Sequence, residues 1–187
     1  MDDGSSYEIE ILPPLLLHPT LWLEVERRQR EIQRRKAADL PTAQEAFLRM
    51  MKTEIAPTLR TWNFKGSGQN FRLTSADYWL ALGFQRSAWN DALRVRFTVN
   101  VSAVSHEAWR AARETDPQLP AEPNPSTHAG PGACERLGFL SRGNDHWWDV
   151  DVEAGLATSE VATDVLGDIE NYALPWFENY SARNEEM

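Results

Sequence analysis

The chain has 187 residues, of which 42% are hydrophobic and 25% charged, which is typical of a soluble globular domain and excludes a disordered or fibrous chain. Its one cysteine, Cys134, excludes an internal disulfide and favours a reducing compartment. No secretory signal is recognisable, and no run approaches the roughly 20 apolar residues of a membrane span. We therefore expect a cytoplasmic protein that does not enter a membrane.

The net charge of −9 is concentrated in the last part of the chain. Residues 114–187 contain fifteen acidic and three basic side chains, whereas residues 65–113 contain seven basic and three acidic ones. An acidic field disfavours nucleic acid there and favours a positively charged partner, although the same charge also keeps a protein soluble.

Residues 1–41 are predicted to form an appendage. Residues 1–20 contain three prolines and no periodic pattern, which indicates an extended arm. Thr20 is suited to cap a helix from Leu21 to about Ala38, with a thin apolar stripe and Glu–Arg pairs four residues apart. This helix is a solvated surface, a docking element for a larger assembly, or a nucleic-acid contact. Its basic residues are Arg27, Arg28, Arg30, Arg34, Arg35 and Lys36.

A second helix is predicted from Thr42 to Leu59. Thr42 and Glu45 form a capping box, and the apolar residues that follow recur at helical spacing. Pro57 lies inside this pattern and should kink or tighten the last turns.

Three strands are predicted to follow as an antiparallel meander at residues 70–74, 78–86 and 94–103. The third strand alternates without a fault, so a register slip of one residue would bury two arginines. Its polar face consists of Arg94, Arg96, Thr98, Asn100 and Ser102. This face is either the wet side of the sheet or, if open, a ligand surface.

The remaining elements complete the predicted domain. A short helix at 106–113 precedes a proline-rich loop at 114–133, which we expect to be mobile. Residues 136–141 and 145–152 are predicted to form a hairpin that turns at Gly143 and Asn144. Thr158 is predicted to cap a helix ending near Tyr172, and a short turn follows from Pro175.

These elements predict an α+β fold, with an antiparallel sheet of about five strands and the helices Thr42–Leu59 and Thr158–Tyr172 on one face. Residues 42–182 would form a single domain, to which residues 1–41 are appended.

Several short motifs occur in a recognisable order. They are Ile55-Ala56-Pro57-Thr58-Leu59, Trp62-Asn63-Phe64-Lys65, Gly83-Phe84-Gln85-Arg86-Ser87, Phe97-Thr98-Val99-Asn100-Val101, Arg136-Leu137-Gly138, Trp147-Trp148 and Leu174-Pro175. In this order the chain resembles, from about residue 47 to 180, a bacterial family known as domain of unknown function 4304. The resemblance implies a fold outline and no established activity. The family is similar in size and architecture to small immunity proteins of bacterial toxin systems, which is an analogy of fold only.

No catalytic, cofactor or metal site is predicted, because the four histidines are far apart and Cys134 has no partner at ligand spacing. His146 and Asp149 would point to opposite faces of one strand, which argues against acid–base catalysis by that pair.

Two surfaces remain as candidate sites. One is a tryptophan flanked by carboxylates, consisting of Asp145, Trp147, Asp149 and Asp151. The other is the polar sheet face, consisting of Gln85, Arg94, Arg96 and Asn100. Exposed tryptophan is a common interface anchor, and the acids would suit a lysine- or arginine-rich partner, but the N-terminal arm could equally cover this tryptophan.

The sequence therefore favours a non-catalytic protein-binding domain, of the immunity or inhibitor type, that neutralises a basic bacterial toxin or effector. The first alternative is an enzyme or small-ligand protein that uses the polar sheet face. A second is a subunit that docks through the N-terminal arm and helix, and a third is nucleic-acid binding through the helix arginines.

Overall fold

The computed structural model describes residues 19–127, 130–155 and 157–185. The chain divides into two compact units, Met1–Leu40 and Pro41–Met187. The predicted extended arm lies almost wholly outside the described residues. Among the helices that the structure describes, none is both long enough and apolar enough to cross a membrane.

The first unit contains helix α1 (Pro19–Ala37), so the helix begins before Thr20 instead of being capped by it. Arg27 and Arg34 each bind the glutamate three residues earlier, at 2.7 Å, and the bonded guanidinium lowers the pKa of that carboxyl. Arg30 and Arg35 each lie 3.9 Å from a glutamate four residues earlier. At least four of the six basic side chains are thus paired with glutamates of the same helix, as in a solvated helix that carries many ion pairs.

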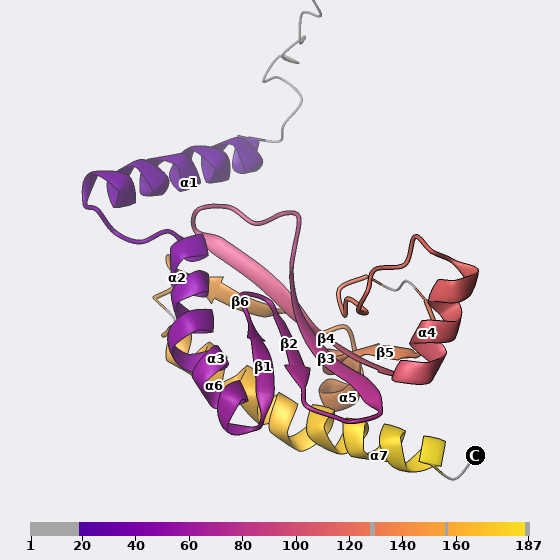
Figure 1. The fold of residues 1–187 in the computed structure, drawn as a ribbon. Coiled ribbons are helices and arrows are strands. Elements are labelled where there is room, and N and C mark those ends of the chain that lie inside the picture. The colour runs from indigo at the N-terminus through magenta and orange to yellow at the C-terminus, as the bar shows by residue number, and fades with distance from the viewer. Residues whose placement is uncertain (1–18, 128–129, 156, 186–187) are drawn as a thin grey trace, which may run out of the picture. The chain divides into compact units, whose positions relative to one another are not determined.

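The second unit is built on a six-stranded antiparallel sheet (Figure 1). The strands are β1 (Phe64–Ser67), β2 (Asn70–Leu73), β3 (Tyr78–Arg86), β4 (Arg94–Ser105), β5 (Ala133–Arg136) and β6 (Trp148–Asp151). The first four strands follow one another as a meander, which confirms the predicted antiparallel arrangement and adds β1 at its start. Both β5 and β6 pair with β4.

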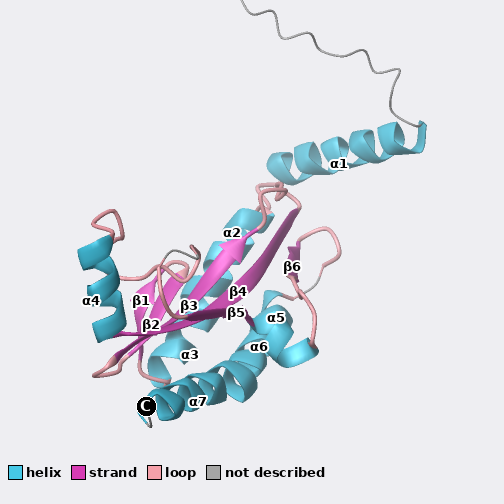
Figure 2. Cartoon of the chain, turned by 90° about the vertical axis from the view of Figure 1, so that its right-hand side faces the viewer, coloured by secondary structure: helices cyan, strands magenta, loops and turns pink. Residues whose placement is uncertain are grey.

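Two helical runs cover one face of this sheet (Figure 2). The first consists of α2 (Ala43–Met50), the π-helical turn η2 (Met51–Ile55) and α3 (Ala56–Thr61), and the second of α6 (Thr158–Asp168), η3 (Ile169–Ala173) and α7 (Leu174–Glu185). The fold is therefore α+β, as predicted. The capping box of Thr42 and Glu45 is present, whereas Thr158 makes no side-chain cap and α7 is much longer than one turn.

Each π-helical turn lies two residues before a proline, Pro57 in the first run and Pro175 in the second. Proline has no N–H and its ring clashes with the carbonyl four residues earlier, so a widened turn lets the helix continue past it. The helix is therefore disturbed near Pro57, but by a widened π-helical turn that ends at Ile55 and not by the tightened turns that were predicted.

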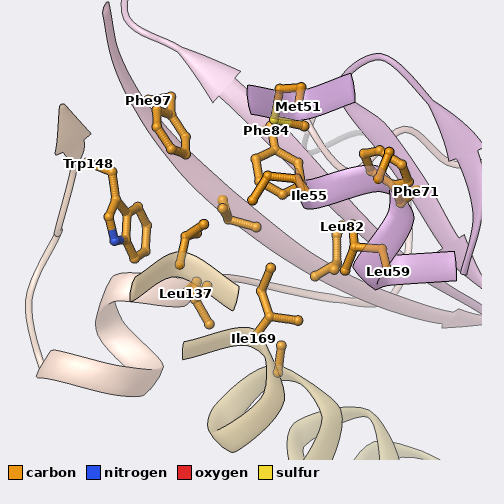
Figure 3. Packing of buried hydrophobic residues seen from close by; sticks show 14 of the residues in the cluster. Met51, Ile55, Leu59, Phe71, Leu82, Phe84, Phe97, Leu137, Trp148 and Ile169 are labelled. Atoms are coloured by element: carbon orange, nitrogen blue, oxygen red, sulfur yellow. The ribbon is translucent and has the colours of Figure 1, made fainter. Parts of the chain in front are cut away.

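The core fills the space between these helices and the sheet (Figure 3). Phe97 of β4 packs at 5.2 Å from the ring of Phe47 and at 6.0 Å from that of Trp148. The strand alternation predicted for β4 is confirmed, because its apolar side chains are buried in this layer.

The hairpin predicted for residues 136–152 is wrong. Residues 137–142 form the helix α5 (Leu137–Arg142), and β6 pairs with β4 instead of with residues 136–141. Leu137 and Leu140 are three residues apart, a spacing that suits a helix, and both pack on the core. Gly143 has φ of 71° and ends α5, so the residue taken for a hairpin turn is a helix C-cap.

The proline-rich loop follows α4 (His106–Thr115) and packs on the second face of the sheet. Pro123 and Pro125 are buried, and the buried Trp109 donates from Nε1 to the carbonyl of Pro120 at 3.2 Å. A Cβ at Gly83 would lie 2.7 Å from Ser126 Oγ, so glycine allows the loop to approach β3. The described part of the loop thus covers sheet surface, a packing that the sequence, read as a mobile loop, did not indicate.

Candidate protein-binding site

The two surfaces proposed from the sequence meet on the second face of the sheet. Strand β6 pairs with β4, and this register sets Arg94 opposite Asp151 and Arg96 opposite Asp149. Side chains at paired positions project from the same face. Trp147 with its carboxylates therefore forms one surface with Arg94 and Arg96 of the polar face.

Trp147 is the centre of this surface. Its indole ring lies 6.0 Å from the guanidinium carbon of Arg96 and 5.2 Å from that of Arg136, which ends β5. The hydroxyl of Thr98 donates to the carbonyl of His146 at 3.1 Å, which fixes the backbone just before the ring. Trp147 remains partly exposed. We call this group the arginine–tryptophan cluster: Arg94, Arg96, Arg136, Asp145, Trp147 and Asp149.

The carboxylates of the cluster are paired within the protein. Asp149 accepts two hydrogen bonds from Arg94, at 2.6 and 2.8 Å, and lies 3.3 Å from Arg96. Asp145 accepts from Arg136 at 2.6 Å. Burial raises the pKa of Asp145, but hydrogen bonds from Arg136 and Trp147 outweigh it and hold that pKa below its usual value. The expectation of an acidic stripe free to pair with a basic partner is therefore corrected: here three arginines balance the acids.

Asp151 lies beside the cluster and has a local role. Its Oδ1 accepts hydrogen bonds from the backbone N–H groups of Glu153 and Ala154, both at 2.9 Å. It therefore shapes the turn that leaves β6, as short acidic side chains commonly do.

The other half of the predicted ligand face is divided, because Gln85 is partly exposed and lines a surface pocket, whereas Asn100 is not on an open surface. Asn100 is only 2% exposed and donates to Gln85 Oε1 at 3.0 Å, while Thr98 is completely buried. Asn100 and Thr98 are therefore part of the packing of the sheet. Of that predicted face, Arg94 and Arg96 are the residues that belong to the arginine–tryptophan cluster.

The arginine–tryptophan cluster lies in a part of the chain that matches a known protein family. Residues 55–179 match the family described as a domain of unknown function (DUF4304). The chain belongs to this family. No curated protein and no solved structure matches it. Every residue of the arginine–tryptophan cluster lies within the matched range, whereas α1, α2 and most of η2 lie outside it, so the cluster is part of the DUF4304 domain itself.

A second network of hydrogen bonds and ion pairs lies next to the cluster in this DUF4304 domain. Trp148 is 3% exposed and donates from Nε1 to Asp164 of α6 at 2.8 Å. The same carboxyl oxygen accepts from Arg142 at 2.6 Å, and Arg142 also lies 3.2 Å from Asp168. The network ties β6 to α5 and α6, which holds the neighbouring Trp147 in place.

Acid should weaken this network. Burial raises the pKa of Asp164, but hydrogen bonds from Arg142 and Trp148 outweigh it and hold that pKa below its usual 3.8. The stabilisation is therefore fully present above the unfolded value and lost as the pH falls through the folded one. We expect urea unfolding from about pH 6 to about pH 2 to show a shallower decline for Asp164→Asn than for the wild type. Equal slopes would contradict this assignment.

His146 and Cys134 are both partly buried. The His146 ring packs edge-on against Trp148, at 4.7 Å, and burial together with Arg142 lowers its pKa. Burial raises the pKa of the Cys134 thiol, which keeps it in its unreactive form. Within residues 19–127, 130–155 and 157–185, no group of three or more His, Cys, Asp or Glu is placed to hold a metal ion.

Two residues of this surface were missed by the sequence analysis. Arg136 belongs to the cluster because it is paired with Asn100 across β4 and β5, a contact between distant segments. Trp89, in the loop between β3 and β4, is 93% exposed. The adjacent Asn90 exchanges hydrogen bonds with the backbone of Arg96, at 2.8 and 3.1 Å, so this loop is anchored to the same end of β4.

Proposed function

We propose that this DUF4304 protein is a non-catalytic protein-binding domain of the inhibitor or immunity type, and that its contact surface is the arginine–tryptophan cluster. The observation that carries the proposal is the position of Trp147 between Arg96 and Arg136. Tryptophan and arginine are the residue types that most often dominate the energy of protein interfaces.

The cluster is ordered before any partner arrives. Arg94 and Arg136 are held by carboxylates of the same surface, and the backbone at His146 is held by Thr98. Immobilising a flexible side chain on binding costs about 0.5–1.5 kcal/mol, and a group already fixed by neighbours avoids much of that cost. Trp89 adds an exposed indole at the same end of β4. These features support a rigid interface with two aromatic anchors.

The charges suggest how the partner is selected. The cluster itself offers both signs, so it suits a partner surface that also carries both. The excess of acid in residues 114–187 acts over a longer range and would steer a basic protein toward the domain. A basic bacterial toxin or effector remains the proposed partner. The single half-buried cysteine suits a reducing compartment such as the bacterial cytoplasm.

Site-specific photo-crosslinking can identify this partner. A crosslinking amino acid at Asn144, which is exposed beside the cluster, should capture a discrete protein in the native cells. The matched control places it at Lys52, which is exposed on η2. A partner captured equally from both positions, or from neither, would contradict the proposed surface.

Substitution of Trp147 then tests the interface directly. We expect Trp147→Ala to weaken binding of the purified partner by at least about tenfold, because buried interface tryptophans commonly contribute 2 kcal/mol or more. Lys52→Ala should leave the affinity unchanged, and calorimetric titration of both variants gives the comparison. Binding that survives Trp147→Ala unchanged would exclude the cluster as the contact surface.

Docking into a larger assembly is a second candidate for the first unit. Leu21, Trp22, Leu23 and Val25 are all exposed near the start of α1. An apolar end on an otherwise charged helix is typical of a surface that another chain covers. Deletion of residues 1–40 would abolish such an assembly and leave partner binding by the cluster intact.

A further inference from the structure

A pocket of about 520 Å³ lies near the other end of β4, where α4 begins. Residues of the β1–β2 hairpin, the start of β3 and His106 of α4 line it. This volume is within the range of about 300–1,000 Å³ that small-molecule sites occupy. The pocket is therefore large enough for a nucleotide-sized ligand and distinct from the arginine–tryptophan cluster.

Two side chains of this pocket, those of Lys65 and Arg72, carry positive charge. Lys65 of β1, Arg72 of β2 and His106 line it, and no lining residue is acidic. Lys65 and Arg72 are directly paired across the two strands, so both side chains project from the same face. Arginine binds a phosphate through two parallel hydrogen bonds, and lysine binds it as a point charge.

An aromatic surface lies beside these charges. Trp79 of β3 lines the same pocket, with its ring 5.3 Å from the guanidinium carbon of Arg72 and 4.7 Å from the ring of His106. The indole is partly exposed. A planar ring stacked on an aromatic side chain contributes about 1–3 kcal/mol in nucleic-acid complexes.

One carboxylate reaches Arg72 from outside the pocket. Glu122 of the proline-rich loop forms an ion pair with it, and both side chains are substantially exposed. The carboxylate neutralises the group best suited to a phosphate. A bound anion would therefore compete with Glu122 for Arg72.

The frame of the pocket is fixed by hydrogen bonds. The backbone N–H of His106 donates to the carbonyl of Asp77 at 2.8 Å, and that of Tyr78 to the hydroxyl of Ser75 at 3.3 Å. These bonds join the start of α4 and the start of β3 to the turn between β2 and β3. The pocket is thus largely formed in the free protein.

From the cations, the indole and the competing carboxylate together, we propose that this pocket binds a nucleoside 5′-monophosphate, in which a ribose joins a phosphate monoester to a planar aromatic base. The two cations hold the phosphate and Trp79 stacks on the ring. Binding requires no reaction and is independent of the protein partner proposed for the cluster.

The test is a titration of the full chain with adenosine 5′-monophosphate at low salt, followed through the indole N–H resonances of the tryptophans. The resonance of Trp79, assigned with Trp79→Phe, should move, whereas those of Trp89 and Trp147 should not. Adenosine and inorganic phosphate, each lacking one half of the ligand, should bind at least about tenfold more weakly.

Three substitutions should change the affinity for adenosine 5′-monophosphate, two by weakening it and one by strengthening it. Arg72→Ala and Lys65→Ala should each weaken binding by about tenfold or more, since each removes a charge-assisted contact. Glu122→Ala should tighten it about two- to fivefold, because an exposed ion pair contributes up to about 1 kcal/mol. Lys52→Ala, which removes an exposed lysine elsewhere, should have no effect.

Tighter binding by Glu122→Ala cannot arise from misfolding. This variant therefore shows whether weaker binding in the other two reflects loss of a contact or damage to the fold. A Trp79 resonance that stays still in both the wild type and Glu122→Ala would overturn the proposal. So would equal binding of adenosine and its monophosphate, or a Lys65→Ala protein that binds like Lys52→Ala.

Discussion

Replacing Trp148 with alanine should lower the free energy of unfolding by about 3–5 kcal/mol, the usual cost of removing a large buried aromatic side chain. The indole is 3% exposed and stacks against Phe97 at 6.0 Å (Figure 3). It also donates to Asp164 at 2.8 Å. Alanine would leave a cavity between β6 and α6 and remove that hydrogen bond. Urea unfolding, followed by far-ultraviolet circular dichroism, measures the change.

Two further variants separate packing from hydrogen bonding at this position. Trp148→Phe keeps an aromatic ring but has no N–H for Asp164, and we expect a loss of about 1–3 kcal/mol. A double-mutant cycle with Asp164→Asn should give a coupling of about 0.5–3 kcal/mol, as found for residues in direct contact. If Trp148→Phe were as damaging as Trp148→Ala, or the coupling were zero, the Asp164 contact would contribute nothing to stability.

The parts of the fold that follow a long, regular pattern could be predicted from the sequence. Residues 94–103 alternate throughout, and a slip of one residue would bury Arg94 and Arg96, so β4 and its antiparallel pairing with β3 were predictable. The helical runs beginning at Thr42 and Thr158 have the apolar spacing of helices. Local periodicity determines such elements, because each side chain must reach the same core.

Short segments were not predictable in the same way. Leu137 and Leu140 fit a helix, whereas Leu137 and Phe139 fit a strand, and six residues are too few to decide between them. Phe139 is in fact half exposed and Leu137 completely buried. The choice of α5 depends on tertiary packing, which is invisible in a single sequence.

In the candidate site, too, local periodicity was predictable from the sequence and contacts between distant segments were not. Strand alternation correctly grouped Trp147 with Asp149 and separated both from Trp148. It could not show that Arg96 and Arg136 enclose the indole, because these arginines belong to strands far away in the sequence. A formal charge count treated Asp145 and Asp149 as free acids, whereas pairing between strands neutralises them.

The packing of α5 against the segment before β6 explains why a glycine is needed at position 138. A Cβ there would lie 2.5 Å from the backbone nitrogen of His146, closer than atoms can approach, so one segment must move. We expect Gly138→Ala to destabilise the domain by about 1–3 kcal/mol, the typical cost of overpacking. Because His146 directly precedes Trp147, the same substitution should shift the Trp147 indole resonance and weaken partner binding.

Gly167 of α6 provides the matched control, since a Cβ there would meet no atom within 4 Å apart from those of its own helical turn. In an unstrained helix, glycine to alanine should stabilise the protein by about 0.5–1 kcal/mol. Urea unfolding should therefore give opposite signs for Gly138→Ala and Gly167→Ala, although both exchange the same atoms within a helix. If Gly138→Ala were also stabilising, and left the Trp147 resonance in place, α5 would not be the element that positions the cluster. Opposite signs would instead show that contact between α5 and His146 determines where the indole between Arg96 and Arg136 lies.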